Sequence, residues 1–353
     1  MRLNRRWLAP TVVLYNYYTS WSAEEREEAD RLTQAMIDGL RALGHRVEAA
    51  EFWRDIRPAL APFDPMEWVV FNWCEGVEAE FAGDARVCAE MDELGYTYTG
   101  NPPETLRLSV QKDRVKAVLR RYDVPTPPGN AFTHPDQVTP QTWDQAWFPA
   151  IVKPTSQHCS VAVTREAVVH TLAQLRDRVA YIVQTLGEPA LAERFIIGRE
   201  INVGIWGNSP PRLLPLREID FSRIPDPLHR MVTWDSKWVP NSPDWNSMPV
   251  IEQPQVSPSL YERIRRVALK TFRACGCRDY ARVDLRIDAE ERVWVVDVNP
   301  NPDITYQGGF AGACYAAGYT YAEAVSRIIG MAAARLVRKR QQRASAAVLT
   351  PRS

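Results

Sequence analysis

The amino-acid sequence predicts an α/β protein with α+β units after its first domain, and three observations lead to this prediction. With 353 residues, the chain is long enough for two or three domains that share one body. Strand, helix and strand patterns follow one another within residues 12–71, an order that is typical of a parallel α/β layer. Two alternating segments, 281–287 and 293–299, flank an acidic turn and predict a β-hairpin.

The first unit begins with a predicted strand at residues 12–15. A helix is expected over 22–43, and Gly44 ends it. The apolar residues of this helix recur at helical spacing: Leu32, Met36, Leu40 and Leu43. Strands are then predicted at 45–50 and 67–71, which completes a small parallel layer.

Two further units follow the prolines at positions 102 and 103. The second has a predicted helix over 104–122, and then a hairpin-like pair of strands at 148–153 and 161–163 around a polar loop. The third has a strand at 201–206 and a helix at 258–275 before the hairpin. A polar tail rich in Ala and Ser is expected to be disordered. The predicted divisions are therefore 1–103, 104–190, 191–337 and a tail at 338–353.

Composition excludes several classes of function. Lys and Arg together number 43, as do Asp and Glu, so no basic field attracts nucleic acid. No apolar run reaches the roughly 18 residues of a membrane span. The six cysteines are scattered, which favours free thiols in the cytoplasm. Small molecules are therefore the expected partners, rather than nucleic acid or membrane.

The polar face of the predicted hairpin carries two carboxylates and an amide. Asp284 on one arm falls nearly opposite Asp297 on the other, and Asn299 shares that face. Like charges directly opposed across a sheet are destabilising, and a hard cation resolves this. Oxygen-only ligands suit Mg²⁺. The alternative is a solvated strand face on which the aspartates pair with Arg282 and Arg286.

Seven segments, in matching order, resemble the ATP-grasp superfamily and specifically its D-alanine–D-alanine ligase branch. The most specific are 281–284 with 297–299, 148–154 and 193–200. Weaker ones lie at 98–100, 111–113, 234–237 and 22–26. The resemblance implies an ATP-grasp fold, in which ATP is clamped between two α+β subdomains behind an N-terminal parallel α/β domain. It also implies an ADP-forming carboxylate–amine ligase and a homodimer.

The resemblance further implies a metal set and two catalytic residues. Asp284, Asp297 and Asn299 would hold two Mg²⁺ ions, for which Mn²⁺ would substitute. The family usually has Glu where this sequence has Asp297, so the shorter side chain has a different reach. Arg282 and Lys237 are the expected catalytic residues, and Arg282 would stabilise the charge that develops on a tetrahedral intermediate.

Six residues are implied to bind the nucleotide: Lys112, Lys153, Ser160, Glu193, Ile196 and Glu200. The two lysines would contact the ATP phosphates, and the serine belongs to the loop that covers them. The first glutamate would face the adenine amino group and the second the ribose hydroxyls. Backbone groups around the isoleucine would line the adenine edge, where Gly198 gives the chain its turn.

The substrate segments depart from the family. His158 and Cys159 stand where a glycine and a serine are expected. Asp303 replaces a glycine, and no serine follows it to hold an acceptor carboxylate. Glu25 is expected to bind the amino group of the first substrate, although Glu24 matches the family's position equally well. Aromatic residues are concentrated in these segments: Tyr15, Tyr17, Tyr18, Trp21, Trp73, Trp238 and Tyr306.

Three functions are compatible with this pattern. The first is a ligase that does not use D-alanine on both sides, because Asp303 suits a cationic or neutral acceptor. The second is a true D-alanine–D-alanine or D-alanine–D-lactate ligase. The third, from another class, is an ATP-binding pseudoenzyme or regulatory module. The retained metal and lysine positions favour an enzyme over a pseudoenzyme.

Overall fold

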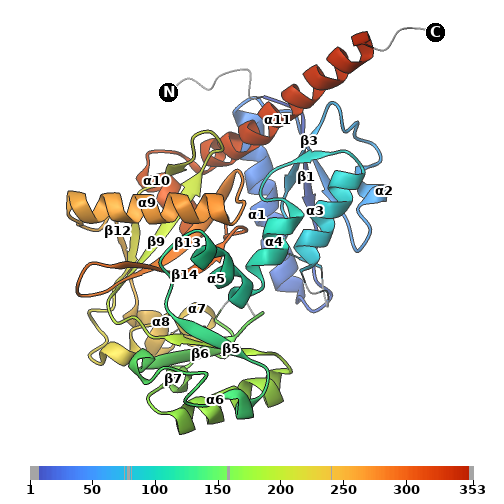
Figure 1. Cartoon of the computed structure of the whole chain (residues 1–353). Coiled ribbons are helices and arrows are strands. Elements are labelled where there is room, and N and C mark those ends of the chain that lie inside the picture. Colours follow the sequence, from blue (N-terminus) through green and yellow to red (C-terminus); the bar gives the residue numbers. More distant parts are fainter. Residues whose placement is uncertain are drawn as a thin grey trace.

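The computed structural model describes residues 8–74, 76–77, 80, 82–156, 160–239 and 241–349. Three sheets organise it (Figure 1), and each is covered by helices. Within the described residues, no helix is long and apolar enough to cross a bilayer. The cysteines for which the structure gives a state, five in number, are free thiols as expected.

The N-terminal domain is a parallel sheet, as the strand–helix–strand pattern predicts, and its strand order is β2-β1-β3-β4. Its elements are β1 (Thr11–Tyr15), α1 (Ala23–Ala42), β2 (Val47–Glu51), α2 (Arg57–Leu60), β3 (Val69–Asn72), α3 (Gly83–Glu93), β4 (Thr97–Tyr98) and α4 (Pro103–Ser109). The helix α1 ends where Gly44 has a φ of 91°. Strand β1 lies between β2 and β3, so the chain changes direction across the sheet there.

The central unit is an antiparallel sheet of order β5-β8-β6-β7. Its elements are α5 (Lys112–Arg121), β5 (Gly129–Phe132), β6 (Ala150–Pro154), β7 (Val168–Val169), α6 (Leu172–Leu186) and β8 (Ala190–Arg194), with short 3-10 turns at Pro135–Gln137, Gln145–Trp147 and Arg165–Ala167. Because β8 pairs with β5 and β6, the predicted boundary at 190/191 falls inside a strand. The central sheet ends at Arg194.

Two predicted elements of this unit differ in the structure. The helix expected at 104–122 is interrupted between α4 and α5, where the Lys112 N–H donates to the Thr155 carbonyl at 3.0 Å. The strand expected at 161–163 is absent from this described stretch, because Ser160 and Ala162 have φ values of 63° and 56°. Strand β6 pairs instead with β7 and β8.

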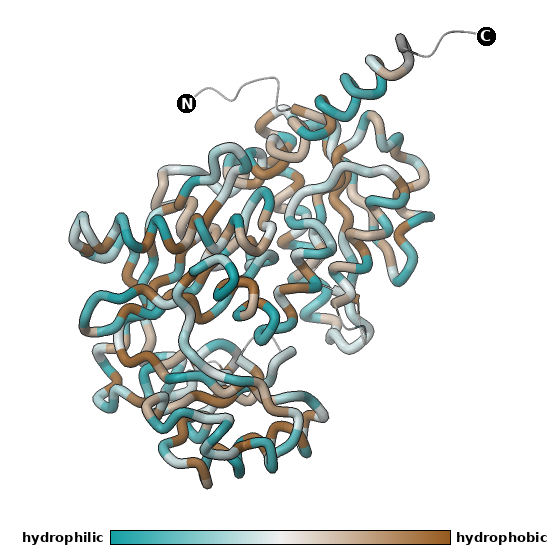
Figure 2. The backbone as a smooth tube through the Cα atoms, in the orientation of Figure 1, coloured by the Kyte–Doolittle hydropathy of each residue, from teal (hydrophilic) through white to brown (hydrophobic). Residues whose placement is uncertain are grey.

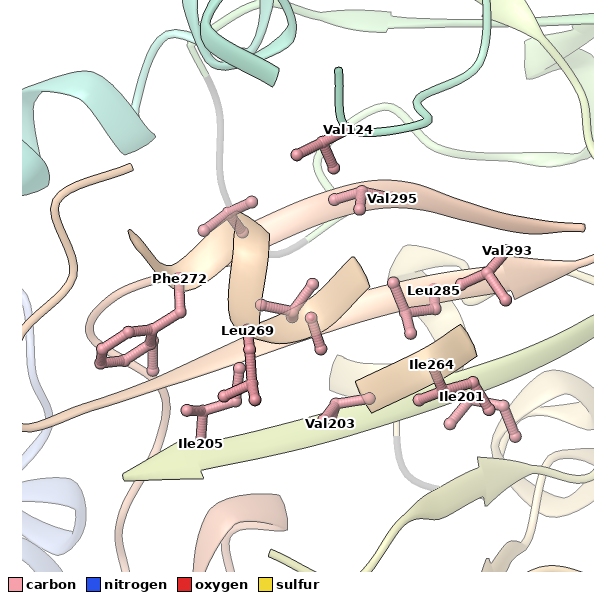
Figure 3. Close-up of a cluster of buried hydrophobic side chains, with 14 of the residues drawn as sticks. Val124, Ile201, Val203, Ile205, Ile264, Leu269, Phe272, Leu285, Val293 and Val295 are labelled. Atoms are coloured by element: carbon pink, nitrogen blue, oxygen red, sulfur yellow. The ribbon is translucent and has the colours of Figure 1, made fainter. Parts of the chain in front are cut away.

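The C-terminal unit is built on the sheet β12-β11-β9-β13-β14, with β10 beside β9. Its elements are β9 (Arg199–Trp206), β10 (Arg212–Leu213), β11 (Arg217–Ile219), η5 (Pro227–His229), α7 (Trp234–Trp238), α8 (Pro243–Ser247), β12 (Val250–Glu252), α9 (Pro258–Ala274), β13 (Tyr280–Ile287), β14 (Val293–Asn299), α10 (Gly309–Ala316) and α11 (Tyr321–Leu349). Helix α9 covers one face of this sheet, and Figure 3 shows Ile264, Leu269 and Phe272 among the strand side chains Ile201, Val203 and Leu285.

The tail that was expected to be disordered is helical as far as Leu349. Its Ala, Arg and Lys residues are strong helix formers. Two side chains also anchor this part of α11, because Lys339 donates to the Gly95 carbonyl and Arg340 to the Met66 carbonyl. The projecting end of α11 is mostly hydrophilic (Figure 2).

A buried ionic cluster joins the N-terminal and C-terminal units. The Asp279 side chain is fully buried and accepts from the Gly100 N–H at 3.0 Å, from Asn208 at 2.8 Å and from Arg335 of α11. Arg335 also donates to the Tyr98 carbonyl at the end of β4. These contacts fix the N-terminal sheet, the C-terminal sheet and α11 to one another.

Candidate active site

The hairpin of β13 and β14 brings the predicted metal residues together. Asp284 lies opposite Asp297, and Arg282 lies opposite Asn299, which confirms the predicted register. On the other face, Val283 and Leu285 are fully buried beneath α9. A β-bulge follows the Asp284–Asp297 pair, so that the partner of Leu285 is Val295.

Asp284 is held by two neighbours on this polar face. Arg282 donates from Nε to Oδ1 at 2.8 Å and from Nη2 to Oδ2 at 3.0 Å. Asn202 on β9 donates to the same Oδ1 at 2.9 Å. The pairing of Asp284 with an arginine, the alternative to a metal site, is therefore present. The charge of Asp284 raises the pKa of Arg282 even though burial opposes it.

Asp297 and Asn299 complete an oxygen-rich patch. The Asp297 Oδ1 accepts from the Val298 N–H at 3.0 Å, and the Asn299 Oδ1 accepts from the Asn301 N–H at 3.0 Å. A cluster of three or more His, Cys, Asp or Glu side chains does not occur among the residues that the structure describes. The donor set here is instead two carboxylates and an amide.

A buried ionic network lies on the central unit. Glu193 is 2% exposed and accepts from Lys153 at 2.7 Å and from Lys116, which also donates to Thr126 at 2.8 Å. Burial alone would raise the pKa of Glu193, but the two lysines outweigh it and lower that pKa. Glu193 therefore balances two cations, and its predicted contact with the adenine amino group stays a prediction.

The two predicted phosphate lysines lie within reach of the charge of Asp297. That charge acts to raise the pKa of both Lys112 and Lys153. For Lys112 burial is the larger effect and lowers its pKa. For Lys153 burial also lowers the pKa, but Glu193 and Asp297 together raise it. Lysines of the central unit and carboxylates of the C-terminal hairpin therefore share one electrostatic environment.

Two residues of this site were not predicted from the sequence. Lys116 lies one helical turn after Lys112 on α5, and that spacing places both on one face and is the signal that could have revealed it. Arg286 was named only in the alternative to a metal site, as a partner of an aspartate, but it lies across the sheet from Glu200 and donates to it at 3.0 Å. That partner depends on the β9–β13 register, which the sequence pattern does not reveal.

Arg286 is buried and connects three segments around the predicted adenine edge. It donates to the Ile196 carbonyl at 3.0 Å and to the Arg230 carbonyl at 2.7 Å. Its guanidinium carbon lies 5.3 Å from the ring centre of Phe195 and 5.4 Å from that of Phe221. The Ile196 carbonyl therefore already accepts a hydrogen bond from Arg286. Burial raises the pKa of Glu200, although the charge of Arg286 acts to lower it.

Gly198 turns the chain between β8 and β9, as predicted. Its φ is 155°, and a Cβ at this position would lie 1.8 Å from the Ile287 carbonyl oxygen. Only glycine fits this close approach. The turn sets Glu193 and Glu200 on two different sheets.

The loop after β6 contacts the segment around α7. The Ser160 hydroxyl donates to the Val232 carbonyl at 3.1 Å, and Arg165 forms an ion pair with Asp244 at 3.1 Å. Lys237 lies on α7, close enough to Glu200 for its charge to act on that carboxylate. These contacts bring Ser160 and Lys237 to the same side of the site.

The predicted substrate residues are not all brought together. Glu25 forms a capping box with Ser22 at the start of α1, where its carboxylate accepts from the Ser22 N–H at 2.7 Å. It does not line the cavity described below. His158, Cys159 and the side chain of Trp238 lie outside the described residues, whereas Asp303 lines that cavity.

A cavity of about 190 Å³ lies at the carboxyl ends of β1 and β3. The segment after Asn299 forms its other wall, with Asn301 and Asp303 among the lining residues. Its aromatic lining residues are Tyr15, Tyr17, Tyr18, Trp21, Trp73 and Tyr280. Most of the aromatic concentration seen in the sequence therefore converges on one cavity beside the hairpin.

This fold and site define an ATP-grasp ligase, a class of ATP-dependent enzymes. The solved D-alanine–D-alanine ligase of Bacillus anthracis in complex with ATP superimposes with a TM-score of 0.72 and 20% identity, covering 94% of this chain and 99% of that one. The Coxiella burnetii enzyme superimposes with a TM-score of 0.70 and 18% identity, over 97% and 99% of the two chains. These similarities establish the fold.

The family follows from sequence. The family described as D-ala D-ala ligase C-terminus matches residues 119–330. The chain belongs to the D-alanine–D-alanine ligase family. It is 30% identical over 313 residues to the uncharacterized protein y4sG of Sinorhizobium fredii, covering 86% of this chain and 87% of that protein. It is 27% identical to the D-alanine–D-alanine ligase of Desulforudis audaxviator, over 87% of this chain and 94% of the relative.

Proposed function

We propose that this enzyme uses ATP to join a carboxylate to an amine through an acylphosphate, and that D-alanine is not its substrate on both sides. The pairing of Asp284 with Asp297, within the electrostatic reach of Lys112 and Lys153, is the observation that carries the proposal. Lysines on one unit and carboxylates on the other suit a polyphosphate held between them.

The hairpin residues fit Mg²⁺ in the type of donor. Asp284, Asp297 and Asn299 would hold the ion through oxygen atoms, and Mg²⁺ would neutralise charge on the ATP phosphates. Both oxygens of Asp284 already accept from Arg282. Because a carboxylate has about four lone-pair sites, it can accept from Arg282 and bind a cation together.

The chain's own residues then position two successive reactions. One carboxylate oxygen attacks the γ-phosphorus of ATP, and ADP leaves with the electrons of the broken bond. The amine attacks the acyl carbon of the resulting acylphosphate and loses a proton, and inorganic phosphate leaves. Lys112 and Lys153 would hold the phosphates in line for the first step. Arg282 would stabilise the oxyanion of the second step.

The substrate proposal is supported by what surrounds the hairpin. Six aromatic side chains line the neighbouring cavity, and such rings can form flat walls for a larger or planar substrate. Asp303 carries a negative charge into that cavity, which disfavours a free carboxylate. The alternative is a true D-alanine–D-alanine ligase, the activity named for the Desulforudis audaxviator relative.

The proposal can be tested by measuring ADP release with ATP and Mg²⁺ over a panel of carboxylates and amines, with the products identified by mass spectrometry. We expect a ligated product from a pair other than two D-alanines. If D-alanine alone has the highest kcat/KM and forms D-alanyl-D-alanine, the substrate proposal is wrong. If ATP binds but no pair releases ADP, the protein is a pseudoenzyme.

A further inference from the structure

Two buried carbonyl groups lie at the end of the β13–β14 hairpin that is opposite its turn. The last cross-strand pair at this end is Arg282 with Asn299. Tyr280 and Pro300 lie just beyond that pair, and both residues are buried. Pro300 has no N–H group, so the ladder of hydrogen bonds between the two strands cannot continue through it. The Tyr280 and Pro300 carbonyls therefore need a donor from outside the hairpin.

Asn101 supplies this donor from the N-terminal side of the molecule. It lies between β4 and α4 and is 3% exposed. Its Nδ2 carries two hydrogens and donates to the Tyr280 carbonyl at 2.8 Å and to the Pro300 carbonyl at 2.5 Å. Its Oδ1 accepts from the Arg278 N–H at 2.6 Å. One side-chain amide therefore takes the place of the missing ladder and bridges the ends of the two strands.

The backbone next to Asn101 is itself held in place. The Gly100 N–H donates to the Asp279 carboxylate at 3.0 Å, and the Gly100 carbonyl accepts from the Arg278 Nε at 2.8 Å. Gly100 has a φ of 89°, a conformation that favours glycine. Asp279 is bound in turn by Arg335 of α11. The amide of Asn101 is therefore a fixed point against which the end of the hairpin is placed.

A short chain of hydrogen bonds runs from Asn101 to a predicted metal ligand. The Pro300 carbonyl and the Asn301 N–H belong to one planar peptide group. Asn101 donates to the oxygen of this peptide group, and its N–H donates to the Asn299 Oδ1 at 3.0 Å. An amide oxygen is the atom through which Asn299 would bind a hard cation. The direction of that oxygen therefore depends on Asn101, although Asn101 bonds to neither Asn299 nor the cation.

We propose that Asn101 is a positioning residue of the metal site, which acts through the peptide group between Pro300 and Asn301 to direct the Asn299 side chain. This inference rests on the proposed ligase function, because it assigns Asn299 to a cation that accompanies ATP. Loss of a group that orients a metal ligand typically weakens metal binding about 10- to 100-fold. Because a peptide group stands between Asn101 and Asn299, we expect a smaller effect, of about fivefold.

The first measurement needs no nucleotide. Hydrogen exchange of residues 299–303 is followed by mass spectrometry in the full chain. Asn101→Ala removes the donor to the Pro300 carbonyl, so we expect this segment to exchange at least about tenfold faster than in the wild type. An unchanged exchange rate would overturn the proposal.

Thr105→Val is the matched control for Asn101→Ala. Thr105 is also 3% exposed, and its hydroxyl also donates from the N-terminal unit to two backbone carbonyls of the C-terminal unit. These are the carbonyls of Cys275 at 3.2 Å and Gly276 at 2.9 Å, which lie at the end of α9 and not on the hairpin. We expect this variant to leave exchange of residues 299–303 as in the wild type. Equally faster exchange in both variants would show general loosening and overturn the proposal.

The second measurement addresses the metal site. Calorimetric titration with ATP is carried out without Mg²⁺ and at a series of Mg²⁺ concentrations. Asn101→Ala should raise the Mg²⁺ concentration that half-maximally enhances ATP binding about fivefold, and should leave the Kd for ATP without Mg²⁺ within about twofold of the wild type. Thr105→Val should keep the wild-type Mg²⁺ dependence even if it lowers stability. If Asn101→Ala keeps it too, the proposal is wrong.

A double-mutant cycle tests the route through Asn299. In the Asn299→Ala protein the ligand to be directed is absent, so adding Asn101→Ala should change the Mg²⁺ dependence by less than about twofold. The same shift in both backgrounds would mean that Asn101 does not act through Asn299. Asn101→Ser, which keeps one donor and should have an intermediate effect, serves the same tests if Asn101→Ala does not fold.

The outcome is separable from that of the ligase proposal. Mg²⁺-dependent ATP binding without ADP release from any substrate pair would refute the ligase proposal alone. Mg²⁺-dependent binding that Asn101→Ala and Thr105→Val affect equally would refute the role of Asn101 alone. ATP binding by the wild type that does not respond to Mg²⁺ would refute the metal site, and both proposals with it.

Discussion

The ionic network around Glu193 and the aromatic cavity around Tyr17 both lie near the β13–β14 hairpin, yet the network consists of paired charges and the cavity of packed aromatic rings. In the network, a buried carboxylate balances two lysines, and a further buried ion pair joins Glu200 to Arg286. In the cavity, rings pack against rings, and Asp303 is the charged side chain among the described residues that line it. The charges of the network are therefore paired with one another in the absence of a ligand, whereas the charge of Asp303 lies in the lining of the cavity.

This difference shows which side of the site can change. Removal of one member of a buried ionic network leaves the others without a partner, so the network resists substitution. Aromatic walls can exchange residues with smaller effects, because each ring contributes area and a weak quadrupole. Departures from the family occur in both regions, with Asp297 in place of the usual Glu at the hairpin and Asp303 and aromatic residues at the cavity.

The largest effect is expected when the network loses its carboxylate. Glu193→Gln leaves Lys116 and Lys153 buried without a counter-charge, and we expect a loss of about 3–5 kcal/mol in the free energy of unfolding. Urea denaturation measures it. The matched control is Glu290→Gln, which removes a carboxylate 65% exposed beside Arg292 and should change stability by less than about 1 kcal/mol. Equal small effects would mean that the network is not structural.

The next effect concerns the hairpin. Asp297→Asn keeps the shape of the side chain and removes one charge from the candidate metal site, so we expect turnover to fall about 100-fold or more. Turnover should depend more steeply on Mg²⁺, while the melting temperature stays nearly unchanged. Wild-type turnover at limiting Mg²⁺ would refute the metal assignment. A lower melting temperature with normal Mg²⁺ dependence would make Asp297 a structural residue.

Two lysines that share one carboxylate sharpen the comparison. Lys153→Met should raise the Kd for ATP about tenfold, because Lys153 lies within reach of Asp297 at the candidate phosphate site. Lys116→Met should instead lower stability with little change in this Kd, because Lys116 ties Glu193 to Thr126, whose hydroxyl donates to the Val295 carbonyl of β14 at 2.9 Å. Calorimetric titration with ATP·Mg²⁺ measures both. If the two variants bind ATP equally well, Lys153 has no special phosphate role.

The smallest effect lies far from both regions. His45 is buried, its Nε2 lies 2.7 Å from the Ser326 hydroxyl on α11, and its Nδ1 has no hydrogen-bond partner in the described structure. Burial lowers its pKa from 6.5, so the folded state binds its proton less readily than the unfolded state does. Stability that is present above pH 6.5 is lost as the pH falls towards the folded-state pKa.

We therefore expect the wild type to lose more stability than His45→Gln as the pH falls from 7.5 to 5.5, by at most about 1.4 kcal/mol per pH unit. Urea denaturation at the two pH values measures the difference. His134→Gln, at a residue whose side chain is 61% exposed, is the control and should follow the wild type. Parallel losses in all three proteins would show that His45 does not titrate differently on folding.

How much of the site the sequence predicts depends on the range of the interaction. The pairing of Asp284 with Asp297 was predictable because two alternating arms and a short turn determine a register. The capping role of Glu25 was also local, since Ser22 and Glu25 have the capping-box spacing. The partner of Arg286 was not predictable, because Glu200 reaches it only through pairing of β9 with β13.

The same distinction applies to the fold. Periodicity predicted the parallel layer of the first domain, since each strand and helix has its own pattern. It did not reveal that the helix expected at 104–122 is interrupted at Gln111. No glycine or proline marks that break, which arises where the Lys112 N–H donates to the Thr155 carbonyl. Nor did it assign β8 to the central sheet, because sheet membership depends on long-range pairing.

Helix α11 has a consequence for the order in which the growing chain folds. Val69 at the start of β3 is fully buried against Ala332, Ala333 and Leu336 of α11. Ribosomes add roughly 5–20 residues per second, so about 10 to 50 s pass between the synthesis of β3 and the synthesis of the part of α11 that packs on it. During translation the uncovered strand is open to chaperones, and nascent chains stalled at Gly318 should be cut there by protease more readily than chains that include α11.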